Sequence, residues 1–302
     1  MAKNKAESVK QRLLALARTR KEDFNFVLRQ FVLQRLMYRL SVSKFSGDFL
    51  LKGGLLFWVW NQDFNRPTQD MDLLGFGSDD VELLQATFLA ITQIEADDGL
   101  VFNGDTLTVT EIKEDAKYQG IRVNGRATLV KADIPYQIDI AFDDAVAAVS
   151  TTTKIPVFLS DMPVPEMKVY PLEAVISEKF QAMVALGLAN SRMKDFFDVL
   201  TLAQTMSLDS NKLQAAIKAT FERRATPINR DRLYIFSGAF KTNSDKQKQW
   251  QAFTNKNKLS VSENFSETVT KIQYFIEPLY QHIALGRIDN KIWNANLWNW
   301  EL

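Results

Sequence analysis

The 302-residue sequence contains no cysteine and only one histidine, His282. The absence of cysteine excludes disulfides, thiolate metal sites and Cys-His catalysis. A single histidine argues against a Ser-His-Asp hydrolase and against a histidine-rich metal centre. Any bound metal should therefore be a hard cation held by carboxylates, which indicates Mg²⁺ or Mn²⁺.

Long apolar runs are also missing. No stretch reaches the ~20 apolar residues that span a bilayer. The N-terminal segment MAKNKAESVKQRLL is polar and basic, without the apolar core of a signal peptide. Apolar residues make up 46% and charged residues 24%, as in ordinary globular proteins. We expect a cytoplasmic protein that makes no membrane contact.

The formal net charge of +1 conceals a local basic excess. Residues 211–258 hold 11 Lys and Arg against 3 Asp and Glu, with six aromatic residues between them. Basic residues with interleaved aromatics suit a nucleic-acid surface, where cations meet phosphates and rings stack on bases. The alternative is a solvated helical face whose aromatics belong to the core beneath it.

The spacing of apolar residues predicts the order of elements. Helices are expected over 6–18, 22–41 and 80–94, a short helix after Gly53-Gly54, a buried strand from Thr68 to Phe76, and strands across 100–142. The NGD at 103–105 and the NG at 124–125 are expected to form hairpin turns.

Small residues in AVAAVSTTT (145–153) indicate a boundary, and Pro171 opens a largely helical remainder. The fold class is therefore α+β, with N-terminal helices, a mixed sheet and a C-terminal helical lobe. We expect two domains, 1–155 and 156–302.

Asp70 and Asp72 stand in the apolar run RPTQDMDLLGFG. Side chains alternate along a strand, so both carboxylates share one face while Met71 and Leu73 point into the core. Two close carboxylates are costly to desolvate unless a cation neutralises them, so the pair suits a divalent ion. A solvated strand end is the simpler interpretation of the dipeptide alone.

Asp139 stands between two isoleucines in IDIAF, in a second strand that is otherwise buried. If this strand lies beside the first, three carboxylates converge and could hold two Mg²⁺ ions. Gly53-Gly54 would let phosphate oxygens reach backbone N–H groups, although a helix-entry turn also explains the two glycines.

Four segments together resemble one family. They are KGG, RPTQDMDLLGFG, YQIDIAFDD and EKFQAMVALGLANSRMKDFFDVL. They are similar to AbiEii/AbiGii-type toxins of bacterial toxin–antitoxin and phage-abortive-infection systems, within the DNA polymerase β-like nucleotidyltransferase superfamily. The resemblance runs from about residue 45 to 230, and the last block is its most specific part.

The resemblance implies a role for each matching position. Gly53 and Gly54 would cradle the nucleoside triphosphate (NTP), and Asp70 and Asp72 would bind the metal. Asp139 would be the third carboxylate, placed to act as base toward the acceptor hydroxyl.

The same resemblance assigns roles in the C-terminal block. Lys179 would reach the phosphates, and Lys194 and Asp195 match the family's Lys-Asp block, with Asp195 orienting Lys179 or contacting the nucleotide. Simpler alternatives are a solvated Lys179 paired with a neighbouring glutamate, and an Asp195 favoured by a helix N-terminus. Superfamily members often carry Ser or Thr directly after the glycines, where this chain has Leu55.

The expected activity is metal-dependent transfer of a nucleoside monophosphate from an NTP to an RNA 3′ end, with tRNA the leading acceptor. Growth inhibition and a cognate antitoxin would follow. Two alternatives stay open: modification of a protein hydroxyl or of the toxin itself, and a nucleotide-binding interaction protein without turnover.

Overall fold

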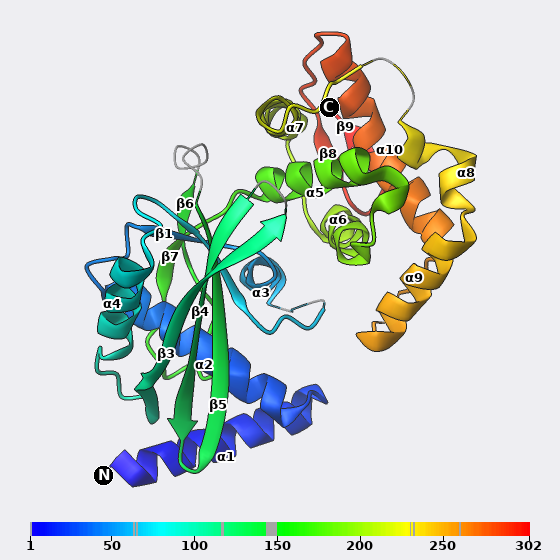
Figure 1. Cartoon of the computed structure of the whole chain (residues 1–302). Coiled ribbons are helices and arrows are strands. Elements are labelled where there is room, and N and C mark those ends of the chain that lie inside the picture. Colours follow the sequence, from blue (N-terminus) through cyan, green and yellow to red (C-terminus); the bar gives the residue numbers. More distant parts are fainter. Residues whose placement is uncertain are drawn as a thin grey trace. The chain divides into compact units, whose positions relative to one another are not determined.

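The computed structural model describes residues 2–62, 64, 66–115, 118–142, 150–229, 231, 233–259 and 261–302. The chain divides into two compact units, Met1–Tyr170 and Pro171–Leu302 (Figure 1). The first combines helices with a mixed sheet and the second is mainly helical, which confirms the α+β class. Part of the expected small-residue boundary, 145–149, lies outside the described residues.

The first unit contains the sheet and the helices that pack on it. Its elements are α1 (Ala2–Arg20), α2 (Phe24–Val42), β1 (Phe49–Lys52), α3 (Leu55–Asn61), β2 (Met71–Gly75), α4 (Val81–Thr92), β3 (Leu100–Asp115), β4 (Tyr118–Leu129), β5 (Ala132–Phe142), β6 (Thr151–Lys154) and β7 (Glu166–Val169). The predicted helices are all present, and β2 is shorter than the strand expected over 68–76.

The seven strands follow the order β3-β4-β5-β2-β1-β7-β6. Strand β2 runs parallel to β5 and antiparallel to β1, so it lies between two strands that are distant from each other in sequence. Strands β3, β4 and β5 form an antiparallel meander. The central position of β2 is what brings the RPTQDMDLL segment beside the IDIAF segment.

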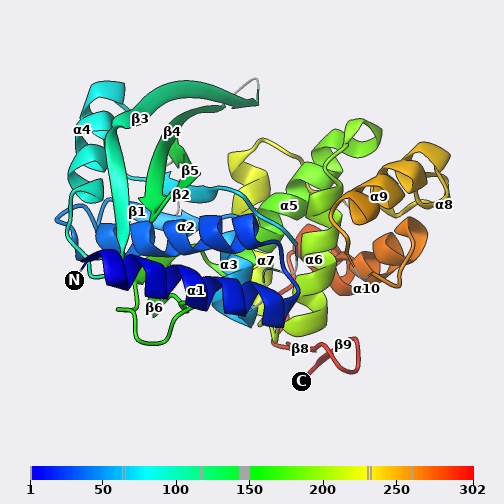
Figure 2. The ribbon, with the colours of Figure 1, turned by 90° about the horizontal axis from the view of Figure 1, so that it is seen from below.

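Helix α2 supplies much of the core of this unit. It packs against β5, β7 and α4, and α1 lies alongside it (Figure 2). Two of its arginines, Arg35 and Arg39, are also buried and both bind Asp98, which lies just before β3. The N–H of Phe26 donates to Asp23, which caps the start of the helix.

The expected hairpin turns at 103–105 and 124–125 are wrong. Asn103 lies inside β3, next to a register irregularity, and Asn124 and Gly125 are paired within β4. Gly125 faces the ring of Tyr136, whose hydroxyl would lie 2.3 Å from a Cβ on that glycine. The glycine is therefore needed for a close contact across two strands, which the Asn-Gly pattern does not distinguish from a turn.

The second unit is built from α5 (Leu172–Leu186), η2 (Gly187–Ala189), α6 (Met193–Thr205), α7 (Ser210–Arg223), η3 (Tyr234–Phe236), α8 (Gly238–Lys241), α9 (Ser244–Lys256), α10 (Phe265–Ala284) and the hairpin β8 (Ile292–Asn294) and β9 (Asn299–Glu301). Phe180, Phe221, Phe236 and Tyr280 form its aromatic core. The tryptophan-rich tail packs on this unit, because Trp293 is buried and Trp300 stacks on Phe275.

The basic segment 211–258 contributes rings to that core. Phe221, Phe236, Phe240 and Trp250 are all buried, so these rings are not available to stack on bases. Several of the basic side chains are exposed: Lys212, Lys218, Lys248, Lys256 and Lys258. Four of the six aromatic residues thus follow the core interpretation, while Tyr234 is exposed and these lysines remain on the surface. None of the described helices is long and apolar enough to cross a membrane.

Candidate functional site

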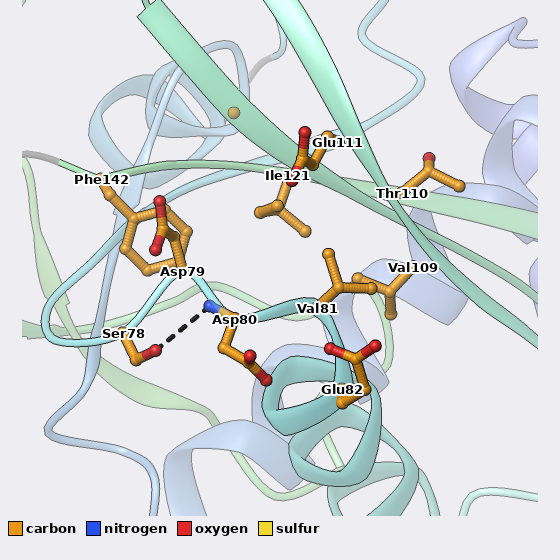
Figure 3. A pocket seen from close by; sticks show the side chains of 11 residues that line it. Ser78, Asp79, Asp80, Val81, Glu82, Val109, Thr110, Glu111, Ile121 and Phe142 are labelled. Atoms are coloured by element: carbon orange, nitrogen blue, oxygen red, sulfur yellow. Dashed lines mark hydrogen bonds between the residues drawn. The ribbon is translucent and has the colours of Figure 1, made fainter.

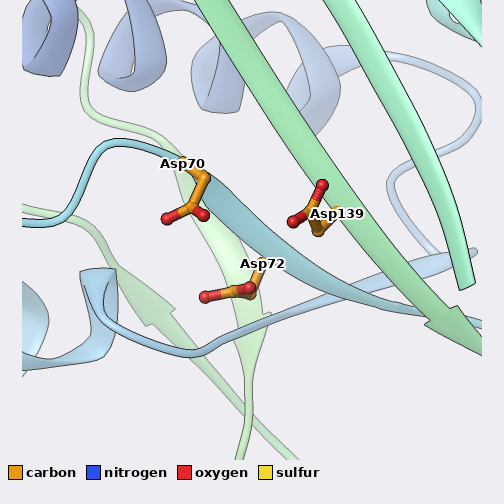
Figure 4. Close-up of side chains that lie close together, drawn as sticks. All are labelled: Asp70, Asp72 and Asp139. Atoms are coloured by element: carbon orange, nitrogen blue, oxygen red, sulfur yellow. The ribbon is translucent and has the colours of Figure 1, made fainter. Parts of the chain in front are cut away.

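Three carboxylates meet on one face of the sheet in the first unit. Asp70 directly precedes β2, Asp72 lies within it, and Asp139 lies beside Asp72 in the parallel strand β5 (Figure 4). One carboxylate oxygen from each residue lies within 4.8 Å of the other two. The sequence-based prediction that the two strands are neighbours is confirmed.

Strand alternation explains why these charges share a face. Met71 and Leu73 of β2, and Ile138 and Ile140 of β5, are buried on the apolar side of the sheet. The residues between them must therefore point to the other side. Because the apolar side chains of both strands are buried on one face, the carboxylates that alternate with them point to the other face.

Each carboxylate has a described neighbour that holds it. Thr68 donates its hydroxyl to Asp70 at 3.1 Å, and the Gly54 N–H donates to Asp72 at 3.4 Å. Arg122 of β4 donates two hydrogen bonds to Asp139, both 2.8 Å long. Asp139 is only 8% exposed.

The Gly53-Gly54 pair packs directly against this cluster. Gly53 has φ +72°, and a Cβ there would lie 1.7 Å from Oδ2 of Asp72. A Cβ on Gly54 would lie 2.7 Å from the hydroxyl of Thr68. The carboxylate of Asp72 therefore requires a glycine at position 53, and the side chain of Thr68 requires one at position 54, whatever the two glycines contribute to a phosphate.

Several residues around the cluster were not predicted from the sequence. Thr68, Arg122 and Gln137 contact the carboxylates, and Lys52 is the cross-strand partner of Asp72. Lys52 and Arg122 add positive charge on either side of the row that contains Asp72 and Asp139. Only the strand register identifies these neighbours, although a lysine directly before Gly53 could have been considered.

Helix α2 supports the turn that carries Asp70. The buried side chain of Gln30 donates to the backbone oxygen of Thr68 at 2.7 Å, and Arg29 donates to Gln69 at 2.9 Å. A glutamine among the apolar residues of this helix was a usable sequence signal for such a contact, because buried amides need partners.

The donor set fits a hard divalent cation. Three convergent carboxylates offer only oxygen ligands, which Mg²⁺ and Mn²⁺ prefer. Three close negative charges repel one another unless cations balance them, and Arg122 supplies only part of that balance. The arrangement suits a metal-assisted phosphoryl or nucleotidyl transfer.

A pocket of about 770 Å³ elsewhere in the first unit is a separate feature. It lies between the start of α4 and strands β3 and β4, with Val109, Ile121 and Phe142 on its apolar side (Figure 3). Strand alternation places these residues on the sheet face opposite Asp139. Its acidic residues are exposed, and Asp80 already caps α4, so we do not assign it a role.

The remaining predicted residues belong to the second unit. The Lys179 ammonium lies 2.9 Å from Asp195 and 2.8 Å from Asp198, and both carboxylates are buried. Nε of Arg192 lies 2.9 Å from the other oxygen of Asp195, an ion pair without hydrogen-bond geometry. The predicted contact between Lys179 and Asp195 is present, so Lys179 is not the solvated partner of a neighbouring glutamate. Asp195 lies in the first turn of α6, as its simpler alternative expected, and it also pairs with Lys179.

The sequence prediction missed Asp198, which follows Asp195 by three positions on α6. Lys194 is exposed. The roles of Lys179, Lys194 and Asp195 toward a nucleotide stay predictions.

Comparison with known proteins adds an independent finding. No curated protein matches the sequence. Among solved structures, JHP933 from Helicobacter pylori is 12% identical with a TM-score of 0.47, covering 86% of this chain and 94% of that one. A second H. pylori structure, provisionally named a nucleotidyltransferase, is 13% identical with the same TM-score, covering 86% and 96%. These values are too low for us to transfer an activity.

The family comparison is decisive. The model of the nucleotidyl transferase AbiEii toxins of type IV toxin–antitoxin systems matches residues 35–271. That match includes the carboxylate cluster, the two glycines and the Lys179 ion pairs. The chain belongs to the AbiEii family of nucleotidyl transferase toxins.

Proposed function

We propose that this chain transfers a nucleoside monophosphate from an NTP to an acceptor hydroxyl, and that the acceptor is an RNA 3′ end, with tRNA as the first candidate. The observation that carries the transfer is the convergence of Asp70, Asp72 and Asp139 on one sheet face. The family provides the class of reaction. The choice of RNA rests on the family resemblance and on exposed lysines of α7 and α9.

In the proposed reaction the acceptor oxygen attacks the α-phosphorus of the NTP. A new P–O bond forms, the bond from the α-phosphorus to the bridging oxygen breaks, and pyrophosphate leaves with that electron pair. When bound, Mg²⁺ or Mn²⁺ would activate the attacking oxygen and stabilise the leaving pyrophosphate. Asp70, Asp72 and Asp139 would hold it.

The chain's own residues perform the remaining tasks. Asp139 would take the proton of the acceptor hydroxyl, and the backbone at Gly53 and Gly54 would lie against the phosphates. Lys179, Lys194 and Asp195 would act on the triphosphate side, with Asp195 holding the Lys179 ammonium. Thr68 and Gln30 keep the turn before β2 in place.

A labelling experiment tests the proposal. The purified chain is incubated with each α-labelled NTP, Mg²⁺ or Mn²⁺, and total tRNA or cell extract, and RNA and protein are resolved separately. Label on RNA supports the proposal. Label on protein instead would replace RNA with a protein hydroxyl as acceptor, and bound nucleotide without any labelled product would refute transfer.

Asp72→Asn should abolish labelling while the melting temperature stays close to that of the wild type. Asp133→Asn is the matched control, because Asp133 is also a sheet aspartate and is paired with Arg126 away from the cluster. Labelling that survives in Asp72→Asn would contradict the metal assignment. A cognate antitoxin, which the toxin family implies, should be sought in the neighbouring gene and should relieve growth inhibition.

A further inference from the structure

Arg122 contacts both carboxylate oxygens of Asp139, one member of the carboxylate cluster. Its Nε donates to Oδ1 of Asp139 and its Nη2 donates to Oδ2, each at 2.8 Å. The strand register places the two residues directly opposite each other in β4 and β5. A planar guanidinium bound to both oxygens fixes the plane of a carboxylate as well as its position.

Arg122 takes up only part of the hydrogen-bonding capacity of Asp139. A carboxylate has about four acceptor positions, and Arg122 fills two of them. Gln137, two residues earlier on the same strand, donates from Nε2 at 3.2 Å to both oxygens. The guanidinium therefore orients the carboxylate without using all of its lone pairs.

Arg122 also changes the charge of the cluster. The three aspartates can carry three negative charges within a few ångströms, and the guanidinium supplies one positive charge at their edge. Its side chain is 37% exposed, so water screens the interaction in part. A divalent ion entering the cluster is thus repelled by Arg122 while the carboxylates attract it.

We propose that Arg122 is a positioning residue that orients Asp139 for transfer. It also lowers the affinity of the carboxylate cluster for the metal as long as no anionic NTP is bound. This inference rests on the proposed function of the cluster. A nucleotide brings negative charge that offsets the guanidinium, so metal and NTP would bind together more tightly than the metal alone.

Arg126 is a matched comparison for Arg122. It lies four residues further along β4, on the same face, and its guanidinium binds Asp133, which lies near the start of β5. Both are cross-strand Arg–Asp pairs on the same two strands, but only Arg122 reaches the cluster. A purely structural role for such a pair would make the two arginines behave alike.

The first measurement is Mn²⁺ affinity of the full chain without nucleotide, from the loss of the free-ion EPR signal. Arg122→Gln should bind Mn²⁺ about tenfold more tightly, because a unit charge near a divalent ion contributes roughly that factor even in water. Arg122→Lys keeps the charge and should bind as the wild type does. Arg126→Gln should be unchanged, since residue 126 lies four positions further along the strand, about 13 Å away, and its guanidinium is paired with Asp133.

The second measurement is the rate of label transfer at saturating metal and NTP. Arg122→Gln and Arg122→Lys should both lower kcat by at least about tenfold, because neither can hold both oxygens of Asp139. Arg126→Gln should retain the wild-type kcat. Thermal unfolding of each variant checks that the fold is kept, and Arg122→Lys serves if the glutamine variant does not fold.

The possible outcomes separate the two proposals. If the wild type binds no Mn²⁺, the metal assignment itself fails. If the wild type binds Mn²⁺ but Arg122→Gln binds it equally or more weakly, the inference about charge is overturned. Wild-type kcat in Arg122→Lys would overturn the positioning role.

Discussion

Gly53→Ala tests whether the position of Asp72 requires a glycine at position 53. The new Cβ would lie 1.7 Å from Oδ2 and 2.4 Å from Cγ of Asp72, where ordinary contact begins at 3.4 Å. The carboxylate would have to move by about 1.7 Å, away from its position beside Asp139. Displacement of a reacting group by ~1 Å can cost about a hundredfold in rate, so we expect at least that loss of transfer.

Stability provides a second, smaller expectation. Alanine at positive φ costs about 1 kcal/mol, and the forced shift of Asp72 should add roughly 1–3 kcal/mol. Gly286→Ala is the matched control, because Gly286 has φ +68° and nothing within 4 Å of its would-be Cβ. It should show the backbone strain alone and keep full activity.

The assay combines urea unfolding, Mn²⁺ binding and label transfer for both variants. The reasoning predicts that Gly53→Ala loses more stability than Gly286→Ala, and that only Gly53→Ala loses metal affinity and rate. Wild-type metal affinity in Gly53→Ala would show that Asp72 is not held where the structure places it, or that it is not a ligand.

Three further predictions concern buried and exposed ion pairs. Asp98→Ala should cost about 3–5 kcal/mol in urea unfolding, because it leaves two buried arginines of α2 uncompensated; a loss below 1 kcal/mol would refute this. Lys179→Met should cost a similar amount, because it leaves Asp195 and Asp198 buried without their lysine. Adding Asp198→Asn to Lys179→Met should restore part of the stability. If the double variant is no more stable than Lys179→Met, Lys179 and Asp198 are not energetically coupled. The hydrogen bond from Arg12 lowers the pKa of Asp161 from 3.8 to about 2. The difference in unfolding free energy between the wild type and Asp161→Asn should therefore be constant above pH 3.8 and shrink as the pH falls toward 2. A difference that does not change with pH would contradict this.

The Lys179 result changes how a nucleotide role should be tested. A lysine that only contacts the phosphates of an NTP would, when replaced by alanine, mainly weaken NTP binding. The structure places this ammonium between two buried carboxylates, so the substitution also removes a structural ion pair. Apparent NTP affinity must therefore be compared at matched folded fractions.

Local patterns predicted the elements whose periodicity is long and regular. Helices α2, α4, α5 and α6 follow apolar spacing with clear start signals, such as Asp80 before α4 and Pro171 before α5. Strand β1 was not recognised, because its three apolar residues merge with the apolar helix that follows the glycines. Two Asn-Gly signals were misplaced for a related reason. Gly125 packs against Tyr136 and Gly104 lies close to Leu89, and a glycine needed for such a contact looks like a turn glycine when read alone.

The sequence by itself determined that any metal here is bound by oxygen, that Asp70 and Asp72 share a strand face, and that Asp139 interrupts a second buried strand. These follow from composition and from the two-residue period of strands, which are local properties. Only the tertiary structure decided that β5 lies parallel to β2 with Asp139 beside Asp72. It also decided that Arg122 donates hydrogen bonds to Asp139 and that Gly53 must lack a side chain. Those contacts depend on strand register between segments many residues apart, which no local pattern encodes.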